Sequence, residues 1–330
     1  MTNDPPPHHV RAVLQDRPGR PDQLRLGTAD VPAPGPGELR LRVHACGLNP
    51  VDWKIAATGV PQWSWPHIPG LDIVGTVTDA GPGADETLVG RLVAVHHDLT
   101  RQGGLAEAAV VAAAAAAVLP AGTDPVLAAT APCPGLTAWQ AVQRTGIGPG
   151  DEVLVIGAAG AVGTFATQLA ASREAAGLTA VVGPDDLARA GALGAGSVLN
   201  YRDGSLADIL DGTRYDVILD LVGGSTTADA GSALRYGGRL ASVARPQWGC
   251  APFTTAPTLV ELALGAVYSE GTADDLAVLA GVLADLVGSL DRGELQPPIH
   301  AVGDLADAPE LLAAMADGTG QKAVIRITAE

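Results

Sequence analysis

The stretch GLNPVDWK, residues 47–54, holds one of the two lysines of this 330-residue chain, and Lys322 is the other. Lys54 follows an Asn-Pro turn, Asp52 and Trp53. An ammonium group in a partly desolvated position can stabilise an oxyanion, and a lowered pKa would also let it donate a proton. Lys54 is therefore a candidate catalytic residue. The alternative is a solvated loop lysine, or one paired with Asp52.

The segment VLVIGAAGAVGTFA, residues 153–166, joins an apolar run to closely spaced small residues. It predicts a buried strand, a tight turn from Gly157 to Gly160, and a helix that contains Gly163. Small residues let the backbone approach a pyrophosphate, whose charge is met by free N–H groups at the helix N-terminus. The pattern is AxGxxG, because Ala158 takes the first glycine position. The predicted cofactor-binding residues here are Gly157, Ala158, Ala159, Gly160, Ala161, Val162 and Gly163. A strand-to-helix turn without a ligand is the alternative.

The elements that must position these residues change along the chain. The first 125 residues are rich in Pro and Gly with short alternating runs such as 38–45, which predicts a β body. From about Asp151, continuous apolar strands alternate with helices, which predicts a parallel sheet covered on both faces. We expect one more strand over 258–269, an amphipathic helix over 272–291 and a closing strand over 321–328.

Composition narrows the class of protein. A formal net charge of −16 opposes a nucleic-acid partner, and the sequence has no basic patch interleaved with aromatic residues. Cys46, Cys133 and Cys250 are too widely spaced for a disulfide framework, which indicates a reducing compartment. Neither a signal peptide nor an apolar run of membrane-spanning length is present. We expect a cytoplasmic protein without a membrane partner.

Six segments in collinear order resemble the medium-chain dehydrogenase/reductase superfamily, within it the zinc-independent quinone oxidoreductase and enoyl reductase branch. They are PAPGPGELRLRVHACGLNPVD (32–52), HIPGLDIVG (67–75), CPGLTAWQAV (133–142), VLVIGAAGAVG (153–163), LGAGSVLNY (193–201) and GTGQKAVIRI (318–327). The resemblance implies an α/β fold. A GroES-like β domain (1–126 and 273–330) holds an inserted Rossmann domain (127–272) with a doubly wound parallel sheet. It also implies a homodimer in which strands around 259–268 pair across a two-fold axis.

The positions of the zinc ligands in the related alcohol dehydrogenases differ here. Those relatives carry Cys where this chain has Asn49, and Gly-His-Glu where it has residues 70–72, Gly-Leu-Asp. Cys133 falls at their third ligand, but one thiolate cannot hold a catalytic zinc ion, which takes three protein ligands. No zinc is predicted. Adjacent side chains in His96-His97-Asp98 point to opposite faces of an extended segment, so we expect a surface or hinge role there.

Without a metal ion, the negative charge that develops on a substrate must be met by hydrogen bonds and a proton. Hydride addition to a quinone or an enone fits this requirement. We therefore predict NADPH-dependent reduction of a small-molecule quinone or enone. One alternative is an enoyl reductase acting on a carrier-tethered acyl chain, although an acidic surface suits an acidic carrier protein poorly. Another is an NADPH-binding protein with little turnover.

The resemblance implies roles for further residues. NPVDWK resembles the Asn-Pro-x-Asp-Trp-Lys of trans-acting polyketide enoyl reductases, which places Lys54 near the nicotinamide. Asn49 could donate to the substrate oxygen or the nicotinamide ribose, or only close an Asn-Pro turn. Thr137 matches a position that packs against the nicotinamide, with helix capping as its alternative. The predicted substrate cleft comprises Asp52, Trp63, Trp65 and His67. Packing under a long loop is the alternative for the aromatic residues.

The preference for one cofactor depends on the end of the second Rossmann strand. Residues 182–184, Val-Gly-Pro, stand where an NAD-specific site usually places an acid. Asp185 and Asp186 fit the first turn of the next helix. Tyr201 matches the family tyrosine beside the adenosine 2′-phosphate, and Arg202 could assist. We expect NADPH in preference to NADH, with Gly183, Tyr201 and Lys322 as further cofactor-binding residues.

Overall fold

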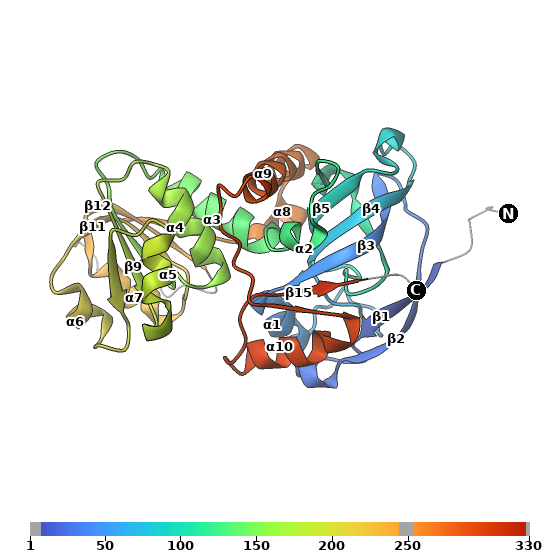
Figure 1. The fold of residues 1–330 in the computed structure, drawn as a ribbon, viewed down its shortest axis with the longest axis horizontal. Coiled ribbons are helices and arrows are strands. Elements are labelled where there is room, and N and C mark those ends of the chain that lie inside the picture. Colours follow the sequence, from blue (N-terminus) through green and yellow to red (C-terminus); the bar gives the residue numbers. More distant parts are fainter. Residues whose placement is uncertain (1–7, 244–253, 328–330) are drawn as a thin grey trace. The chain divides into compact units, whose positions relative to one another are not determined.

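The computed structural model describes residues 8–243 and 254–327, so Cys250 lies outside the described residues. The chain divides into two compact units, Met1–Cys133 with Gly265–Glu330, and Pro134–Leu264 (Figure 1). The first unit is thus made from both ends of the chain. The sequence predicted these two boundaries after residues 126 and 272.

The first unit is built on a mostly antiparallel sheet in the order β14-β15-β3-β4-β5-β7, with β6 also paired to β3. A separate ribbon pairs β1 with β2. The strands are β1 (His8–Leu14), β2 (Arg25–Val31), β3 (Glu38–Leu48), β4 (Asp72–Ala80), β5 (Leu92–His96), β6 (Ala108–Ala112), β7 (Ala117–Val118), β14 (Ala301–Gly303) and β15 (Ala323–Arg326). The helices are α1 (Pro50–Thr58), α2 (Pro125–Ala128), α8 (Val267–Glu270), α9 (Ala273–Asp291) and α10 (Ala308–Ala316).

Strand β3 lies inside this sheet, between β15 and β4, and its alternate apolar side chains face the core. Leu39, Leu41 and Val43 are buried in the core, while Arg42 between them is exposed. Arg40 is buried as well, and its guanidinium pairs with Asp79 of β4 at 2.8 Å. The C-terminal strand β15 lies antiparallel beside β3, with Ile325 opposite Cys46 (Figure 1).

The second unit is a parallel sheet in the order β10-β9-β8-β11-β12-β13. Its strands are β8 (Glu152–Ile156), β9 (Gly177–Val182), β10 (Ser197–Asn200), β11 (Tyr215–Asp220), β12 (Leu234–Ser242) and β13 (Thr258–Glu261). Its helices are α3 (Pro132–Thr145), α4 (Ala161–Ala171), α5 (Leu187–Ala192), α6 (Leu206–Leu210) and α7 (Ser225–Gly231). This strand order is that of the doubly wound Rossmann fold, which confirms the predicted α/β fold class.

The strand predicted over 258–269 is wrong beyond Glu261. Strand β13 has only four residues, and the chain then forms a 3₁₀ turn at Leu264–Ala266 and helix α8. From Gly265 the chain belongs to the first unit, where the Tyr268 hydroxyl donates to the carbonyl oxygen of His96. Tertiary contacts therefore override the apolar pattern. The homodimer across this edge stays a prediction.

The amphipathic helix predicted over 272–291 is confirmed as α9. The Thr272 hydroxyl accepts from the N–H of Asp275 at 3.2 Å, and the Asp275 carboxylate accepts from the N–H of Thr272 at 2.9 Å. This reciprocal cap satisfies two N–H groups that helix formation leaves without partners. Among the described residues, no helix has the length and apolar character needed to cross a membrane.

Candidate functional site

The predicted strand, turn and helix around Gly157 lie in the second unit. Strand β8 ends at Ile156, and Gly157 follows with a φ of 79°, a conformation that a side chain would strain. The N–H of Gly160 donates to the carbonyl of Gly157 at 3.1 Å, which closes the turn. Gly160 is then the N-cap of α4. The N–H groups of the first turn of α4 have no partner within the helix and are available to an anion.

Gly163 fixes how closely α4 packs on this turn. A Cβ atom at Gly163 would lie 2.6 Å from both the Cα and the carbonyl carbon of Ala158, and closer still to the carbonyl oxygen of Gly157. Real Cβ atoms do not approach backbone atoms so closely, so a larger residue would push the helix away. The seven residues predicted to bind a cofactor thus form one tight structure, which fits a dinucleotide pyrophosphate.

The end of β9 lies next to Tyr201. A Cβ atom at Gly183 would lie 3.3 Å from the Tyr201 ring, which is 50% exposed. The Arg202 guanidinium lies 5.0 Å from the centre of the same ring. Asp185 and Asp186 follow in the 3₁₀ turn Pro184–Asp186 that leads into α5, as expected. The cofactor roles of Gly183 and Tyr201 stay predictions.

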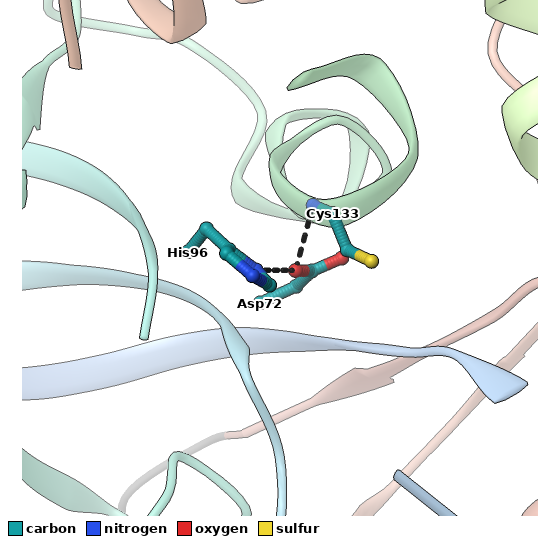
Figure 2. A group of neighbouring side chains, drawn as sticks. All are labelled: Asp72, His96 and Cys133. Carbon is teal, nitrogen blue, oxygen red and sulfur yellow. Dashed lines mark hydrogen bonds and ion pairs between the residues drawn. The ribbon is translucent and has the colours of Figure 1, made fainter. Parts of the chain in front are cut away.

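The first unit contains a cluster that we call the buried polar centre: Asn49, Asp72, His96, Cys133 and Lys322. Asp72 on β4 is its middle and is fully buried. One carboxylate oxygen of Asp72 accepts from Lys322 Nζ at 3.0 Å and from Asn49 Nδ2 at 2.8 Å. The other accepts from the N–H of Cys133 at 2.8 Å and lies 3.3 Å from His96 Nδ1, as Figure 2 shows.

The charges in this centre determine which groups are ionised. Burial alone would raise the pKa of Asp72, but Lys322 and His96 more than offset it and hold that pKa below its usual value. Asp52, in the first turn of α1, is in the opposite situation. Burial, followed by repulsion from Asp72, raises the pKa of Asp52 to about 7, although the Asn49 N–H donates to its carboxylate at 2.7 Å.

Asn49 and Lys322 therefore form hydrogen bonds to each other and to Asp72, and do not face a solvent-filled cleft in this unit. The Asn49 amide donates to Asp72, and its oxygen accepts from Lys322 Nζ at 2.7 Å. Both residues are buried. The substrate contact expected of Asn49 and the cofactor contact expected of Lys322 stay predictions. Each side chain would have to bind the ligand in addition to its present hydrogen-bond partners.

Lys54 is exposed on α1, with its ammonium 5.6 Å from the centre of the Trp53 ring. Asp52 is buried and accepts from the N–H of Asn49, so it is not the surface partner that the alternative supposed. Within the first unit Lys54 is thus not desolvated. A role beside the nicotinamide stays a prediction.

The aromatic residues expected to wall a cleft do gather. The rings of Trp63 and His67 stack at 3.7 Å, and Trp65 meets Trp63 edge-on at 5.6 Å. The Trp63 indole donates to the carbonyl of Leu99 at 2.8 Å, which ties this loop to the next. Burial, followed by the nearby His97, lowers the pKa of His67 to about 4. His67 is therefore neutral at neutral pH and a poor proton donor.

A pocket of about 290 Å³ lies beside this aromatic group. It is lined by side chains that include Asp30, Gln62, His67, Arg101, Gln102 and Val110. Ser64 and Pro66 from the same loop complete one wall. Asp52, Trp63 and His67 instead line a second, smaller pocket, and Trp65 is 40% exposed. The substrate cleft stays a prediction.

Thr137 does not cap its helix, because α3 begins at Pro132 and Thr137 lies in the second turn. Its side chain is buried. The alternative reading of Thr137 is therefore wrong, and its proposed contact with the nicotinamide stays a prediction.

The surface role expected for His96 and His97 is wrong, since both are buried, and the hinge role stays a prediction. His96 is the last residue of β5, and His97 follows it. His96 reaches Asp72, and His97 Nε2 lies 3.0 Å from the carbonyl oxygen of Gln102. Two adjacent histidines at a strand end give the same sequence pattern whether one of them is solvated or both are buried.

The Asp72–His96–Cys133 group brings its possible ligand atoms within 4.8 Å of one another. Its donor set nevertheless does not fit a zinc ion. The two oxygens of Asp72 already accept from four groups, which uses the lone-pair sites that a carboxylate offers. The Lys322 ammonium next to Asp72 would also repel a divalent cation.

Most of the chain is similar in sequence to known proteins. Residues 35–121 match the alcohol dehydrogenase GroES-like domain family, and residues 193–321 match the zinc-binding dehydrogenase family. The chloroplast envelope quinone oxidoreductase homolog of Arabidopsis thaliana is 34% identical over 206 residues, 59% of this chain and 62% of that protein. A probable zinc-binding oxidoreductase of Arthroderma benhamiae is 33% identical over 258 residues, 72% of this chain and 75% of the relative.

Solved structures agree over nearly the full length. The quinone oxidoreductase of Pseudomonas syringae aligns over 96% of this chain and 99% of its own, with a TM-score of 0.83 and 25% identity. A thermostable alcohol dehydrogenase from Pyrobaculum aerophilum aligns over 97% and 100%, with a TM-score of 0.78 and 28% identity. The matched sequence spans just under two thirds of the Arabidopsis relative and of its spinach counterpart, 62% and 64%.

Proposed function

Because the chain belongs to the medium-chain dehydrogenase/reductase family, in its quinone oxidoreductase branch, we propose that it reduces a small-molecule quinone or enone with NADPH and without a metal ion. The observation that carries this proposal is the strand, turn and helix from Glu152 to Ala171. Its tight packing at Gly163 brings the backbone within reach of a pyrophosphate.

When bound, the nicotinamide supplies hydride. The protein holds the dinucleotide through the turn from Gly157 to Gly160 and the first-turn N–H groups of α4. NADPH is proposed over NADH because β9 ends at Val182 and Gly183 follows, without an acid for the ribose hydroxyls. Tyr201, packed against Gly183, supports the same choice.

Two observations support the metal-free part of the proposal. The carboxylate oxygens of Asp72 already accept from four groups, and the Lys322 ammonium lies next to them. Charge on the substrate oxygen is then stabilised by hydrogen-bond donors and a cation. Lys54 remains the proposed cation, and Thr137 the proposed contact to the nicotinamide. If Lys54→Met keeps full turnover, Lys54 is only a surface residue of α1.

A panel of quinones, enones and enoyl thioesters, assayed for oxidation of NADPH and NADH, tests the proposed function. We expect turnover with quinones or enones, and tighter binding of NADPH than NADH by calorimetric titration. Turnover confined to enoyl thioesters would instead indicate a carrier-dependent enoyl reductase. Cofactor binding without turnover across the panel would indicate a binding protein.

Metal analysis tests the second half of the proposal. Protein purified without chelators should contain far less than one zinc ion per chain, because the polar centre offers zinc no free carboxylate. A chelator should leave the rate of NADPH oxidation unchanged. Zinc at about one ion per chain, lost together with activity on chelation, would refute the metal-free assignment.

A further inference from the structure

The pocket of about 290 Å³ in the first unit lies apart from the groups proposed for the reaction. Residues of β2 and β6 line two of its sides, and the loops 62–68 and 100–103 line the others. Its lining residues do not include Asn49, Lys54, Asp72 or Lys322. A dry cavity of about 150 Å³ is large enough to bind benzene. The pocket can therefore hold a ligand of one or two fused aromatic rings.

Part of the pocket wall is apolar and fixed. The apolar side chains are Val31, Pro32, Ile68, Ala108, Ala109 and Val110. All but Pro32 are buried in the core of the first unit. Gln62, Ser64 and Pro66 also line the pocket and are exposed, which gives a ligand access from solvent. Such a wall favours a ligand with an apolar body, because burial of apolar surface is then its main source of affinity.

His67 is the buried polar side chain of this pocket, with an exposed fraction of only 2%. Its backbone forms two hydrogen bonds with Gln15, at 2.7 and 2.8 Å, and its ring stacks on Trp63. The imidazole therefore has a fixed position. Its Nδ1 has no hydrogen-bond partner among the residues that the structure describes. A buried polar atom without a partner is costly, so a ligand that bonds to it gains affinity.

The state of His67 defines the chemical group that it suits. Burial lowers its pKa to about 4, so the ring is uncharged at neutral pH, with one nitrogen that donates and one that accepts. A hydroxyl or a carbonyl group matches such a ring. The smaller pocket that His67 also lines offers about 10 Å³, room for one water molecule at most. An organic ligand of His67 must therefore lie in the larger pocket.

The charged residues of the pocket favour an uncharged ligand. Arg101 Nη1 pairs with Glu38 at 2.5 Å, and the Asp30 carboxylate lies 2.8 Å from His9 Nδ1. An anion entering the pocket would approach the carboxylates of Asp30 and Glu38, whereas a cation would approach Arg101. Neither sign of charge is therefore favoured.

We propose that this pocket binds an uncharged aromatic molecule of one or two fused rings, whose hydroxyl or carbonyl group forms a hydrogen bond with His67. The apolar wall covers the rings. The inference does not depend on the proposed reaction, because the pocket lies within the first unit and the glycine-rich turn belongs to the second.

Calorimetric titration of the full chain with three probes tests the class of ligand. 2-Naphthol has a hydroxyl group, naphthalene has no polar group, and 2-naphthoate carries a negative charge. We expect 2-naphthol to bind about 10-fold more tightly than naphthalene, the effect of one net hydrogen bond, and 2-naphthoate to bind most weakly. Wild-type protein that binds none of the three, or that binds 2-naphthoate most tightly, would overturn the proposal.

Two variants locate the site. His67→Phe keeps a ring to stack on Trp63 but removes both nitrogens, so it should bind naphthalene as the wild type does and lose the preference for 2-naphthol. Ala29→Phe places a large side chain in the pocket and should bind neither probe. Ala277→Phe, at an exposed position of α9, is the matched control and should bind both probes as the wild type does.

A crystal structure with 2-naphthol should place its hydroxyl within hydrogen-bond distance of His67, and it decides the question where a variant does not fold. A ligand outside the pocket would contradict the proposal. The same holds for a retained preference for 2-naphthol in His67→Phe, or for unchanged binding in Ala29→Phe. These titrations need no cofactor, so an absence of NADPH oxidation would refute the proposed function alone.

Discussion

Replacing Lys322 with Met is expected to lower the free energy of unfolding by about 3–5 kcal/mol. Met fills much of the same volume but leaves the fully buried Asp72 carboxylate without its cation. An uncompensated buried charge costs far more than the net value of the pair. Guanidinium unfolding at neutral pH, followed by circular dichroism, measures the difference.

The chain provides a matched control for this experiment, because Lys54 is its other lysine and is exposed. Lys54→Met should change stability by about 0.5 kcal/mol or less. Adding Asp72→Asn to Lys322→Met should recover much of the loss, since it removes the buried carboxylate charge that Lys322 no longer compensates. A loss below about 1 kcal/mol in Lys322→Met would mean that the polar centre does not hold a charged carboxylate.

The stability effect of Lys322 depends on pH in a defined direction. The pKa of Asp72 is lowered in the folded protein, so its contribution is fully present above the unfolded value of 3.8. That contribution is lost as the pH falls through the lower folded value. The gap between wild type and Lys322→Met should therefore narrow on acidification, first as the uncompensated Asp72 of the variant takes up a proton and then, below about 4, as the wild-type Asp72 does.

Gly163→Ala should destabilise the second unit and weaken NADPH binding. The added Cβ would lie 2.6 Å from backbone atoms of Ala158, which cannot move without displacing the turn from α4. Overpacking of this kind costs about 1–3 kcal/mol. Thermal unfolding and calorimetric titration of NADPH give the two quantities.

Variants of two other glycines distinguish the effect of packing on stability from the effect of ligand contact on affinity. Gly191 in α5 has open space around its Cβ position, so Gly191→Ala should be neutral or slightly stabilising. Gly160 has a φ of −66° and only an ordinary contact, 3.4 Å, at its Cβ position. Gly160→Ala should thus keep stability but lower affinity for NADPH, because its methyl group stands where the pyrophosphate approaches. Unchanged stability in Gly163→Ala would contradict the packing observed at the turn.

The spacing of apolar residues and glycines predicted most of the helices and strands, because these elements depend on residues close together in the sequence. The run from Glu152 to Ala171 reads as strand, turn and helix, since its apolar residues and glycines fall where each element needs them. The segment from Leu264 to Glu270 has the apolar pattern of a strand, yet it forms helical turns, and from Gly265 it belongs to the first unit. Contacts such as that of Tyr268 with His96 are invisible to a local pattern.

The candidate site was less accessible from the sequence. Asp72, Cys133 and Asn49 were identified by their positions in a family pattern, but their mutual hydrogen bonds depend on the pairing of β3 with β4 and β15. His96 was missed because a buried strand end and a solvated one look alike.

The position of Lys322 has a consequence for synthesis of the chain. Residues 1–133 leave the ribosome long before β15, and until then the edge of β3 near Cys46 lacks its partner strand and Asp72 lacks its cation. Residues 134–264 form a continuous unit that can fold as soon as it has emerged. The inserted unit should therefore finish folding before the unit that encloses it in the sequence. A nascent chain stalled before Lys322 would expose an unpaired strand edge and depend on chaperones.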